Sequence, residues 1–530
     1  MAENDQAAQS RFRRCLLLGF AGVFAVQALA SLKPGITWDE PFYVFSGQQY
    51  VSWLVNFSGE RSLTREEIDR NWAVNHEHPP AAKMVYGLSQ FFAPPDTISF
   101  YTPRLLAAVL FTGLAVLVYL MTALHFGRPA GVFAALAFVL MPRVFGHGHV
   151  AALDVPVALA IFAATFAFSD AHTGLGRSVL AGFLFGLALL TKFNAVLVPV
   201  VLIPWALWCF RKRAILPCLL LLVIGGGVFL GGWPWLWHDT WPRLKEYTVN
   251  KIERVGDGQR PTGTTAVPVH YLGRTYVEPP APWHYPFVLT LVTVPVALLV
   301  FAGIGIPLSL GKGKPRPGVR EPAVSRRSVG ALLLASALLP LVAGAVPGAP
   351  KYDGVRLFMP AFPFLACLAG IGAAWAWRRR PGKVIVVVLL ALESAALVYT
   401  HPYELSYYNA AVGGAWGAKK LGFETTYWGD TVNADVLVYV NEHCPDGSTI
   451  DVQPPCFRDI GIIPGLKDTL RYLASPGGRT PDFRLMFPRE GYLDASSQAL
   501  LRTGKPIRQW TYLGVPQCLL YDLRPDRSRP

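Results

Sequence analysis

Apolar runs of membrane-spanning length recur along the chain, from Cys15–Leu32 to Val384–Tyr399. A helix needs about 20 mostly apolar residues to cross the hydrocarbon core of a bilayer. Basic clusters stand at the ends of several runs, and such clusters stay in the cytoplasm: Arg11–Arg14, Arg211–Arg213, Lys312–Arg327 and Arg378–Lys383. The pattern therefore predicts a polytopic α-helical membrane protein with about 11 transmembrane helices and a cytoplasmic N-terminus.

Composition supports the membrane class and argues against nucleic acid. The chain is 52% hydrophobic and only 15% charged, which is more apolar than a soluble core requires. A net charge of +14 could indicate nucleic-acid binding. However, the basic residues flank apolar runs, as in membrane topology signals, so we expect no nucleic-acid partner. The expected location is a multi-pass cell membrane protein, in the bacterial inner membrane.

The polar tail forms a second unit in this prediction. The membrane part spans residues 1–402, with large outer loops at 33–103 and 234–285. An odd number of spans then places residues 403–530 outside. Short apolar runs punctuated by Pro and Gly predict a small α/β domain. Its expected elements are a helix at Thr431–His443 and strands at Thr449–Gln453, Asp482–Phe487 and Gln509–Leu523. Cys444, Cys456 and Cys518 fall in this tail, so one disulfide could form there.

Two adjacent acids, Asp39 and Glu40, follow the first apolar run and stand between aromatic residues. Carboxylates beside lipid are costly, so a functional site is one hypothesis. Solvated loop acids or a helix N-terminal cap explain them equally well on their own. Helical spacing of aromatic residues in Pro41–Phe57, and a second such piece at Pro80–Phe92, predicts helices lying in the membrane interface.

The topology gathers further polar residues on the outer face. Acids and bases together there would suit an anionic lipid headgroup, with carboxylates activating a nucleophile and cations holding phosphate. Lys83 follows a rigid His78-Pro-Pro start, while Lys351 and Arg356 flank one short turn. Snorkelling to the interface is the simpler explanation for Arg104 and Lys192. The other members of the set are Asp39, Glu40, His76, His78, Arg143, His147, His149 and Asp154.

Histidines at His76 and His78, and again at His147 and His149, raise the alternative of a metal site. His-x-His spacing is a weak metal signal, and a structural or hydrogen-bonding role is the simpler explanation. No cofactor is expected with certainty, although Asp39 and Asp154 could bridge a divalent metal ion.

Ordered motifs resemble those of the class C glycosyltransferases (GT-C), most of all the protein O-mannosyltransferases and lipid A aminoarabinose transferases. The resemblance runs from about residue 15 to 210 and resumes in a later outer turn. It rests on Trp38-Asp-Glu-Pro-Phe-Tyr43, His78-Pro-Pro-Ala-Ala-Lys83, Arg104-Leu-Leu, Leu153-Asp-Val-Pro156, Gly186-Leu-Ala-Leu-Leu-Thr-Lys192 and Arg356-Leu-Phe-Met-Pro-Ala-Phe-Pro363. The tail stretch from Gly422 to Asp430 has no role in this pattern.

The resemblance implies a GT-C fold, with residues 1–402 as the catalytic domain. It implies transfer of a sugar, a hexose or a pentose, from a polyprenyl-phosphate donor to an outer acceptor, with inversion. Asp39 would be the base, Glu40 would orient it and Asp154 would complete the acidic pair. Lys83, Arg356 and Lys351 would bind the donor phosphate, and His78, Arg143 and His149 are further candidates for substrate or metal contacts.

The chemistry is consistent with this resemblance. A polyprenyl phosphate is an ionised leaving group, so the reaction needs a base for the acceptor and cations for the phosphate, but no strong acid. The alternative is a transporter or flippase of the same lipid-linked sugar, which predicts ionisable residues deep inside several spans. A non-enzymatic assembly or receptor protein acting through its tail leaves Asp39, Lys83 and Asp154 unexplained.

Overall fold

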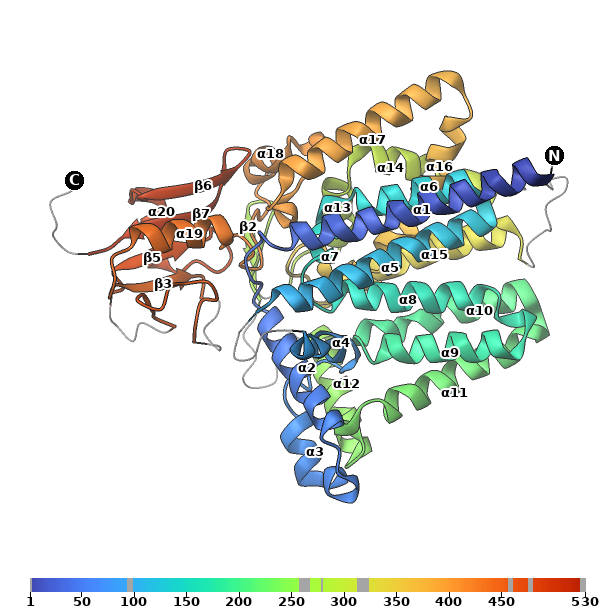
Figure 1. The fold of residues 1–530 in the computed structure, drawn as a ribbon, viewed down its shortest axis with the longest axis horizontal. Coiled ribbons are helices and arrows are strands. Elements are labelled where there is room, and N and C mark those ends of the chain that lie inside the picture. The colour runs from blue at the N-terminus through green and yellow to red at the C-terminus, as the bar shows by residue number, and fades with distance from the viewer. Residues whose placement is uncertain are drawn as a thin grey trace.

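The computed structural model of the chain describes residues 2–92, 99–256, 267–277, 280–311, 324–455, 461–474 and 480–524. Most of the predicted inner cluster Lys312–Arg327, and Cys456 of the tail, lie outside these residues. A bundle of long helices occupies one part of the molecule, and a sheet built from the C-terminal residues lies at one end of it (Figure 1). The N-terminus lies at the opposite end of the bundle (Figure 1).

Apolar helices form the bundle and lie side by side in Figure 1. Their bounds follow the predicted apolar runs closely, because each run buries its backbone polar groups in intrahelical hydrogen bonds. They are α1 (Ala2–Ala30), α5 (Tyr101–Phe126), α6 (Arg128–Val139), α8 (Asp154–Ser169), α9 (Leu175–Leu189), α10 (Val198–Phe210), α11 (Ile215–Gly231), α13 (Tyr285–Thr293), α14 (Val296–Leu310), α15 (Arg326–Ala345), α16 (Ala361–Trp377) and α17 (Arg380–Thr400).

The number of membrane spans is smaller than predicted when it is judged by helix length. Six helices in the described residues are long and apolar enough to cross a bilayer, or up to eight if each bent pair is one span. The expected count of about 11 is therefore not confirmed. The difference arises because α9 and α16 are short, because the run Phe193–Gly231 joins α10 to α11, and because α13 and α14 meet at a bend of 114°.

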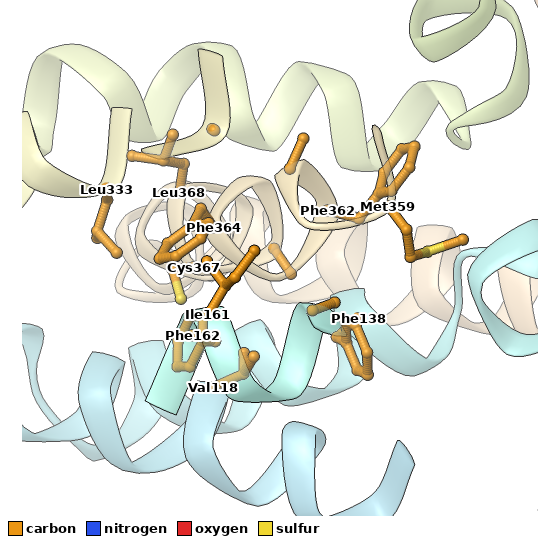
Figure 2. Close-up of a cluster of buried hydrophobic side chains, with 14 of the residues drawn as sticks. Val118, Phe138, Ile161, Phe162, Leu333, Met359, Phe362, Phe364, Cys367 and Leu368 are labelled. Carbon is orange, nitrogen blue, oxygen red and sulfur yellow. The ribbon is translucent and has the colours of Figure 1, made fainter. Parts of the chain in front are cut away.

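Close helix packing fixes the positions of the elements that carry the polar residues. Gly305 of α14 faces α16 so closely that a Cβ there would lie 1.8 Å from the backbone oxygen of Leu368. Figure 2 shows the apolar core in which α8, α15 and α16 meet, and Phe162 and Phe364 lie there with ring centroids 4.9 Å apart. Since η7 (Arg356–Phe358) leads into α16, this packing also sets the position of Arg356.

Short helices cover the sheet end of the bundle, meaning the end at which the C-terminal sheet lies. The two predicted interfacial pieces are confirmed as helical, as α2 and as α4 with η2. The short elements of this end are α2 (Glu40–Val55), η1 (Gly59–Leu63), α3 (Arg65–Trp72), α4 (Ala81–Gly87), η2 (Leu88–Phe91), α7 (Pro142–Gly148), η6 (Pro234–Leu236), α12 (Thr240–Gly256) and the hairpin of β1 (Val269–Tyr271) and β2 (Arg274–Tyr276).

The C-terminal residues form a five-stranded mixed sheet with the strand order β4-β3-β5-β7-β6. Parallel pairs join β3 to β4 and to β5, while β5, β7 and β6 are antiparallel. The predicted helix and strands of the tail are present. Its elements are α18 (Gly414–Lys420), α19 (Ala434–His443), β3 (Thr449–Gln453), β4 (Arg471–Tyr472), β5 (Phe483–Met486), α20 (Ala495–Thr503), β6 (Arg508–Tyr512) and β7 (Val515–Asp522).

The fold class predicted from the sequence, a polytopic helical membrane protein with a small C-terminal α/β part, is confirmed. The domain boundary at 402/403 stays a prediction. Tyr408 and Phe423, beyond that boundary, pack in the same hydrophobic cluster as the membrane helices, and a separate cluster in the tail begins at Val432. Cys444 and Cys518 are buried free thiols.

Candidate active site

Arg356 lies among carboxylates from distant parts of the chain. Its Nη2 is 2.5 Å from Asp39 Oδ2, and its Nε is 3.4 Å from Asp154 Oδ2. Its Nη1 donates to Asp353 Oδ2 over 2.8 Å. The Trp428 ring covers the guanidinium group, whose carbon is 4.0 Å from the ring centroid. We expected Asp39, Asp154, Lys83 and Arg356 to converge. The structure brings Arg356 to both carboxylates, whereas Lys83 binds the loop at Asn75 and His78 instead.

Local structure stabilises the carboxylates of Asp39 and Asp154 beside Arg356. Asp39 is the N-cap residue of α2, and Asp154 is the first residue of α8. Helix N-termini carry partial positive charge, which stabilises carboxylates there. Burial alone would lower the pKa of Arg356, but Asp39, Asp154 and Asp353 outweigh it and raise that pKa well above its ordinary value. Arg356 is therefore held as a cation.

Lys192 adds a second cation to this cluster. Its Nζ donates to Asp154 Oδ1 over 2.6 Å, and the pair is buried, with side-chain exposures of 10% and 1%. Sequence reasoning explained Lys192 by snorkelling. The structure instead shows an ion pair, formed because Lys192 lies between α9 and η4 (Phe193–Leu197), beside the start of α8.

Glu40 forms an ion pair with Arg104. Two hydrogen bonds of 2.8 Å join the carboxylate to the Arg104 guanidinium, and the backbone N–H groups of Thr37 and Ala151 also donate to it. Burial raises the pKa of Glu40, but Arg104 and the backbone donors more than offset this, and the net pKa is lowered. Glu40 thus anchors the loop that carries Asp39. Arg104 is an ion-pair partner and does not snorkel.

Lys83 is fully buried beside the loop that precedes α4. Its Nζ donates to the backbone oxygens of Asn75 (2.8 Å) and His78 (2.7 Å) and to the Tyr50 hydroxyl (3.1 Å). Lys351 is also buried, and its Nζ donates to the backbone oxygens of Val346 and Ala349. The two lysines therefore occupy different surroundings.

An apolar cavity of about 500 Å³ opens beside the cluster. Residues of α8, α10, α15 and α16 and of the turn before η7 line it, most of them apolar. The polar side chains on its wall include His78, Lys192, Lys351 and Tyr352, and Lys83 is not among the lining residues. The cavity thus combines a lipid-like interior with two cations, of which Lys192 pairs with Asp154.

The other candidate contact residues serve the packing around the cluster. Arg143 stacks on the rings of Tyr408 and Tyr427 and donates to the backbone oxygen of Tyr407 over 2.9 Å. His149 Nδ1 is 3.0 Å from Gln27 Oε1 in the bundle. Neither forms a hydrogen bond or ion pair with Asp39, Asp154 or Arg356 in the described part of the chain.

The carboxylates do not form a metal site in this arrangement. In the residues that the structure describes, no group of three or more His, Cys, Asp or Glu side chains is placed to hold a metal ion. The Arg356 guanidinium lies within ion-pair distance of both Asp39 and Asp154 and occupies the place between them. The donor set therefore does not fit a divalent ion bridging the two.

Sequence reasoning missed part of the cluster. Asp353 was visible in the turn Lys351–Arg356 but had no assigned role. Trp428 and Glu424 fall in the tail stretch that remained unassigned, and Arg489 lies beyond β5. The one signal in the sequence was the density of aromatic and acidic residues in Gly422–Asp430, which is unusual for a solvated loop.

The motifs that carry this cluster resemble those of the class C glycosyltransferases, and a comparison with family models supports that resemblance. Residues 77–238 match the family model described as dolichyl-phosphate-mannose-protein mannosyltransferase. This segment includes Lys83, Arg104, Asp154 and Lys192, and the match confirms the family resemblance that the motifs indicated. A search of curated protein sequences finds no match.

Solved structures of other transferases are similar over much of the chain. ArnT from Cupriavidus metallidurans, bound to undecaprenyl phosphate, is 15% identical with a TM-score of 0.49, covering 95% of this chain and 97% of that one. Oligosaccharyltransferase AglB from Archaeoglobus fulgidus is 13% identical with a TM-score of 0.47, covering 85% and 64%. Mycobacterial arabinofuranosyltransferase AftD is 14% identical with a TM-score of 0.43, covering 96% and 42%.

Proposed function

We propose that the chain is a membrane glycosyltransferase that moves a sugar from a polyprenyl-phosphate donor to an acceptor at the sheet end of the bundle. The observation that carries the proposal is the Asp39–Arg356–Asp154 cluster beside a lipid-like cavity. A transporter of the same substrate is not favoured, because the family match is to a transferase.

The cavity suits the donor lipid. Its apolar walls would take the isoprenoid chain nearest the phosphate, since burial of apolar surface is worth about 25 cal/mol per Å². Lys351 and Lys192 lie on the cavity wall. Asp154 pairs with both Lys192 and Arg356, so Arg356 lies close to Lys192. These cations would stabilise the charge that builds on the phosphate as the glycosidic bond breaks. Lys83 would contribute indirectly, since it holds the backbone of His78 on the cavity wall.

Exposure supports Asp39 as the base. The Asp39 side chain is 30% exposed, whereas those of Asp154 and Asp353 are 1% and 8% exposed. Only Asp39 of these three can meet an acceptor arriving from water. Asp154 instead fixes Arg356 and Lys192 in place, and Glu40 fixes the loop of Asp39.

The reaction is a single displacement. An acceptor oxygen attacks the anomeric carbon while its proton passes to Asp39. The bond between that carbon and the phosphate oxygen breaks, and its electron pair leaves with the polyprenyl phosphate, which the cations hold. Attack from the face opposite the phosphate inverts the anomeric centre, and positioning with electrostatic stabilisation supplies the rate.

Several finer features belong to the same proposal. Residues 1–402 would form the catalytic membrane domain and 403–530 an extracytoplasmic domain. The N-terminus would face the cytoplasm of a bacterial inner membrane. The transferred sugar is a hexose or a pentose, and the acceptor is a protein, lipid or glycan of the cell envelope.

Mass spectrometry of the cell envelope tests the proposal. Cells without the chain should lack one sugar on a glycan, glycolipid or protein, and wild-type chain should restore it. Asp39→Asn should restore none, because an amide cannot accept the proton. Asp435→Asn, at an exposed pair with Lys33, is the matched control and should restore the sugar fully. Restoration by Asp39→Asn would refute the assignment of the base.

A further inference from the structure

Arg489 reaches the cluster from the C-terminal sheet. It lies in the loop after β5, yet its side chain is fully buried. Its Nη2 donates to Asp353 Oδ1 over 2.6 Å, and its Nη1 donates to the backbone oxygen of Tyr427 over 2.5 Å. Its Nε is 3.8 Å from Glu424 Oε1. A buried guanidinium is thus shared between the tail and the turn that bears Arg356.

Asp353 connects Arg489 to the proposed catalytic cation. One oxygen of its carboxylate binds Arg489 and the other binds Arg356, at 2.6 and 2.8 Å. Arg356 in turn reaches Asp39 over 2.5 Å. The charges alternate along this chain of contacts, so each group limits where its neighbours can lie.

A second route joins Arg489 to Asp39 through an aromatic ring. The Arg489 guanidinium carbon is 4.7 Å from the Trp38 ring centroid and 4.2 Å from that of Tyr492. Trp38 immediately precedes Asp39, and its backbone N–H donates to Trp428, whose ring covers Arg356. The same side chain therefore supports both members of the Asp39–Arg356 pair.

We propose that Arg489 is a positioning residue of the transferase site, supplied by the C-terminal sheet and acting through Asp353 and Trp38. The proposal rests on the transferase function above. Without Arg489, Asp353 keeps Arg356 as its strongest cationic partner and draws it from Asp39. In this proposal the C-terminal part of the chain keeps Asp39 and Arg356 within hydrogen-bond distance of each other.

Purified full-length protein tests this with a polyprenyl-phosphate sugar as donor and native membranes as the source of acceptor. We expect Arg489→Met to lower kcat by about tenfold or more while the KM for the donor changes by less than about threefold. Arg489→Lys keeps the positive charge but loses the planar guanidinium that binds Asp353 and Tyr427 together, so its kcat should lie between those of wild type and Arg489→Met. Arg484→Met is the matched control, because it breaks an ion pair between Arg484 of β5 and Asp451 of β3 that includes no residue of the cluster.

A double-mutant cycle separates positioning from folding. The double variant Arg489→Met with Asp353→Asn should lose less activity than the product of the two single losses, since both residues share the Arg489–Asp353 contact. A structure of Arg489→Met should show Arg356 no longer within hydrogen-bond distance of Asp39. If Arg489→Met does not fold, Arg489→Lys carries the same test.

Three results would overturn the inference: kcat of the Arg489 variants within about twofold of wild type, a loss in Arg484→Met as large as theirs, or additive effects with Asp353→Asn. Absence of transfer by wild type would instead refute the transferase function itself. The structural readout on Arg356 stays informative in that case, because it needs no turnover.

Discussion

Lys83 and Lys351 are two buried lysines that the sequence assigns to donor phosphate, and their contacts give them different tasks. Lys83 donates to the loop at Asn75 and His78 and to Tyr50 of α2. In the part of the chain that the structure describes, Lys351 donates to the backbone oxygens of Val346 and Ala349, and it lies on the cavity wall. Lys351 can therefore turn to a phosphate at small structural cost, whereas Lys83 cannot.

This difference predicts the behaviour of two variants. Lys351→Met should weaken binding of polyprenyl phosphate about tenfold or more and leave the unfolding temperature nearly unchanged. Lys83→Met should weaken binding and also destabilise the fold by about 1–3 kcal/mol, because it leaves several buried acceptors without a donor. Equilibrium binding to purified protein, with thermal unfolding, measures both. Equal binding by wild type and Lys351→Met would contradict the cavity assignment.

For single residues, the sequence predicts which residue types gather at one end of the bundle better than it predicts which of them pair with each other. Motif order and topology place Asp39, Asp154, Lys83 and Arg356 on one face and predict that they converge. Arg356 does contact both carboxylates. Lys83 does not join them, because its Nζ is held by backbone oxygens of Asn75 and His78. The pairings Glu40–Arg104 and Asp154–Lys192 were not predicted. They join residues far apart in the chain, and the spacing along one sequence carries no information about such contacts.

Among the elements, α14 and α16 show how helix packing controls the site. Gly305 lets α14 approach α16, whose preceding turn η7 carries Arg356. Gly303 lies on the same helix and has open space where a Cβ would be. The two glycines therefore form a matched pair in one helix.

Gly305→Ala should force α14 and α16 apart, lowering stability by about 1–3 kcal/mol and reducing sugar transfer, because Arg356 moves with η7. Gly303→Ala should change stability by about 0.5 kcal/mol or less, or raise it slightly, since Ala favours helix more than Gly does. Thermal unfolding and a transfer assay on both variants give the comparison. Similar losses in the two variants would show that packing at Gly305 is not what positions Arg356.

The bounds of helices and strands were predicted well where the hydrophobic pattern determines them. The angles between elements were predicted poorly, because tertiary contacts determine them. Strand β3 matches its predicted bounds, and α2 differs from its predicted range by one or two residues. The bend of 114° between α13 and α14 was not predicted, since Pro295 allows a bend but neighbouring helices set its angle. The predicted count of about 11 spans is not confirmed at such bends and breaks.

For the molecule as a whole, two buried acids in the C-terminal part make the stability of the fold depend on pH. Burial raises the pKa of Glu424 to about 8, although Arg489 opposes it, and burial raises the pKa of Asp430 to about 7. Both belong to the segment between the bundle and the tail sheet. In the folded chain each holds its proton at pH values where the unfolded chain has lost it.

Stability should therefore fall as pH rises from the unfolded value near 4.5 toward about 8, by on the order of 1 kcal/mol per pH unit. The sign follows because the native state binds more protons than the unfolded state in this window. Glu424→Gln should flatten the dependence of the unfolding temperature on pH, and Glu442→Gln, an exposed acid on α19, should not. An unchanged slope in Glu424→Gln would contradict the assignment.

The central claim is that the cluster of carboxylates and cations at the sheet end of the bundle takes a polyprenyl-phosphate donor. A cryo-EM structure of the full chain in a lipid nanodisc with polyprenyl phosphate tests it most directly. We predict the phosphate within hydrogen-bond distance of Lys351 or Arg356, with the isoprenoid chain in the apolar cavity. Phosphate density at the opposite end of the bundle, or an empty cavity at saturating lipid, would contradict the claim.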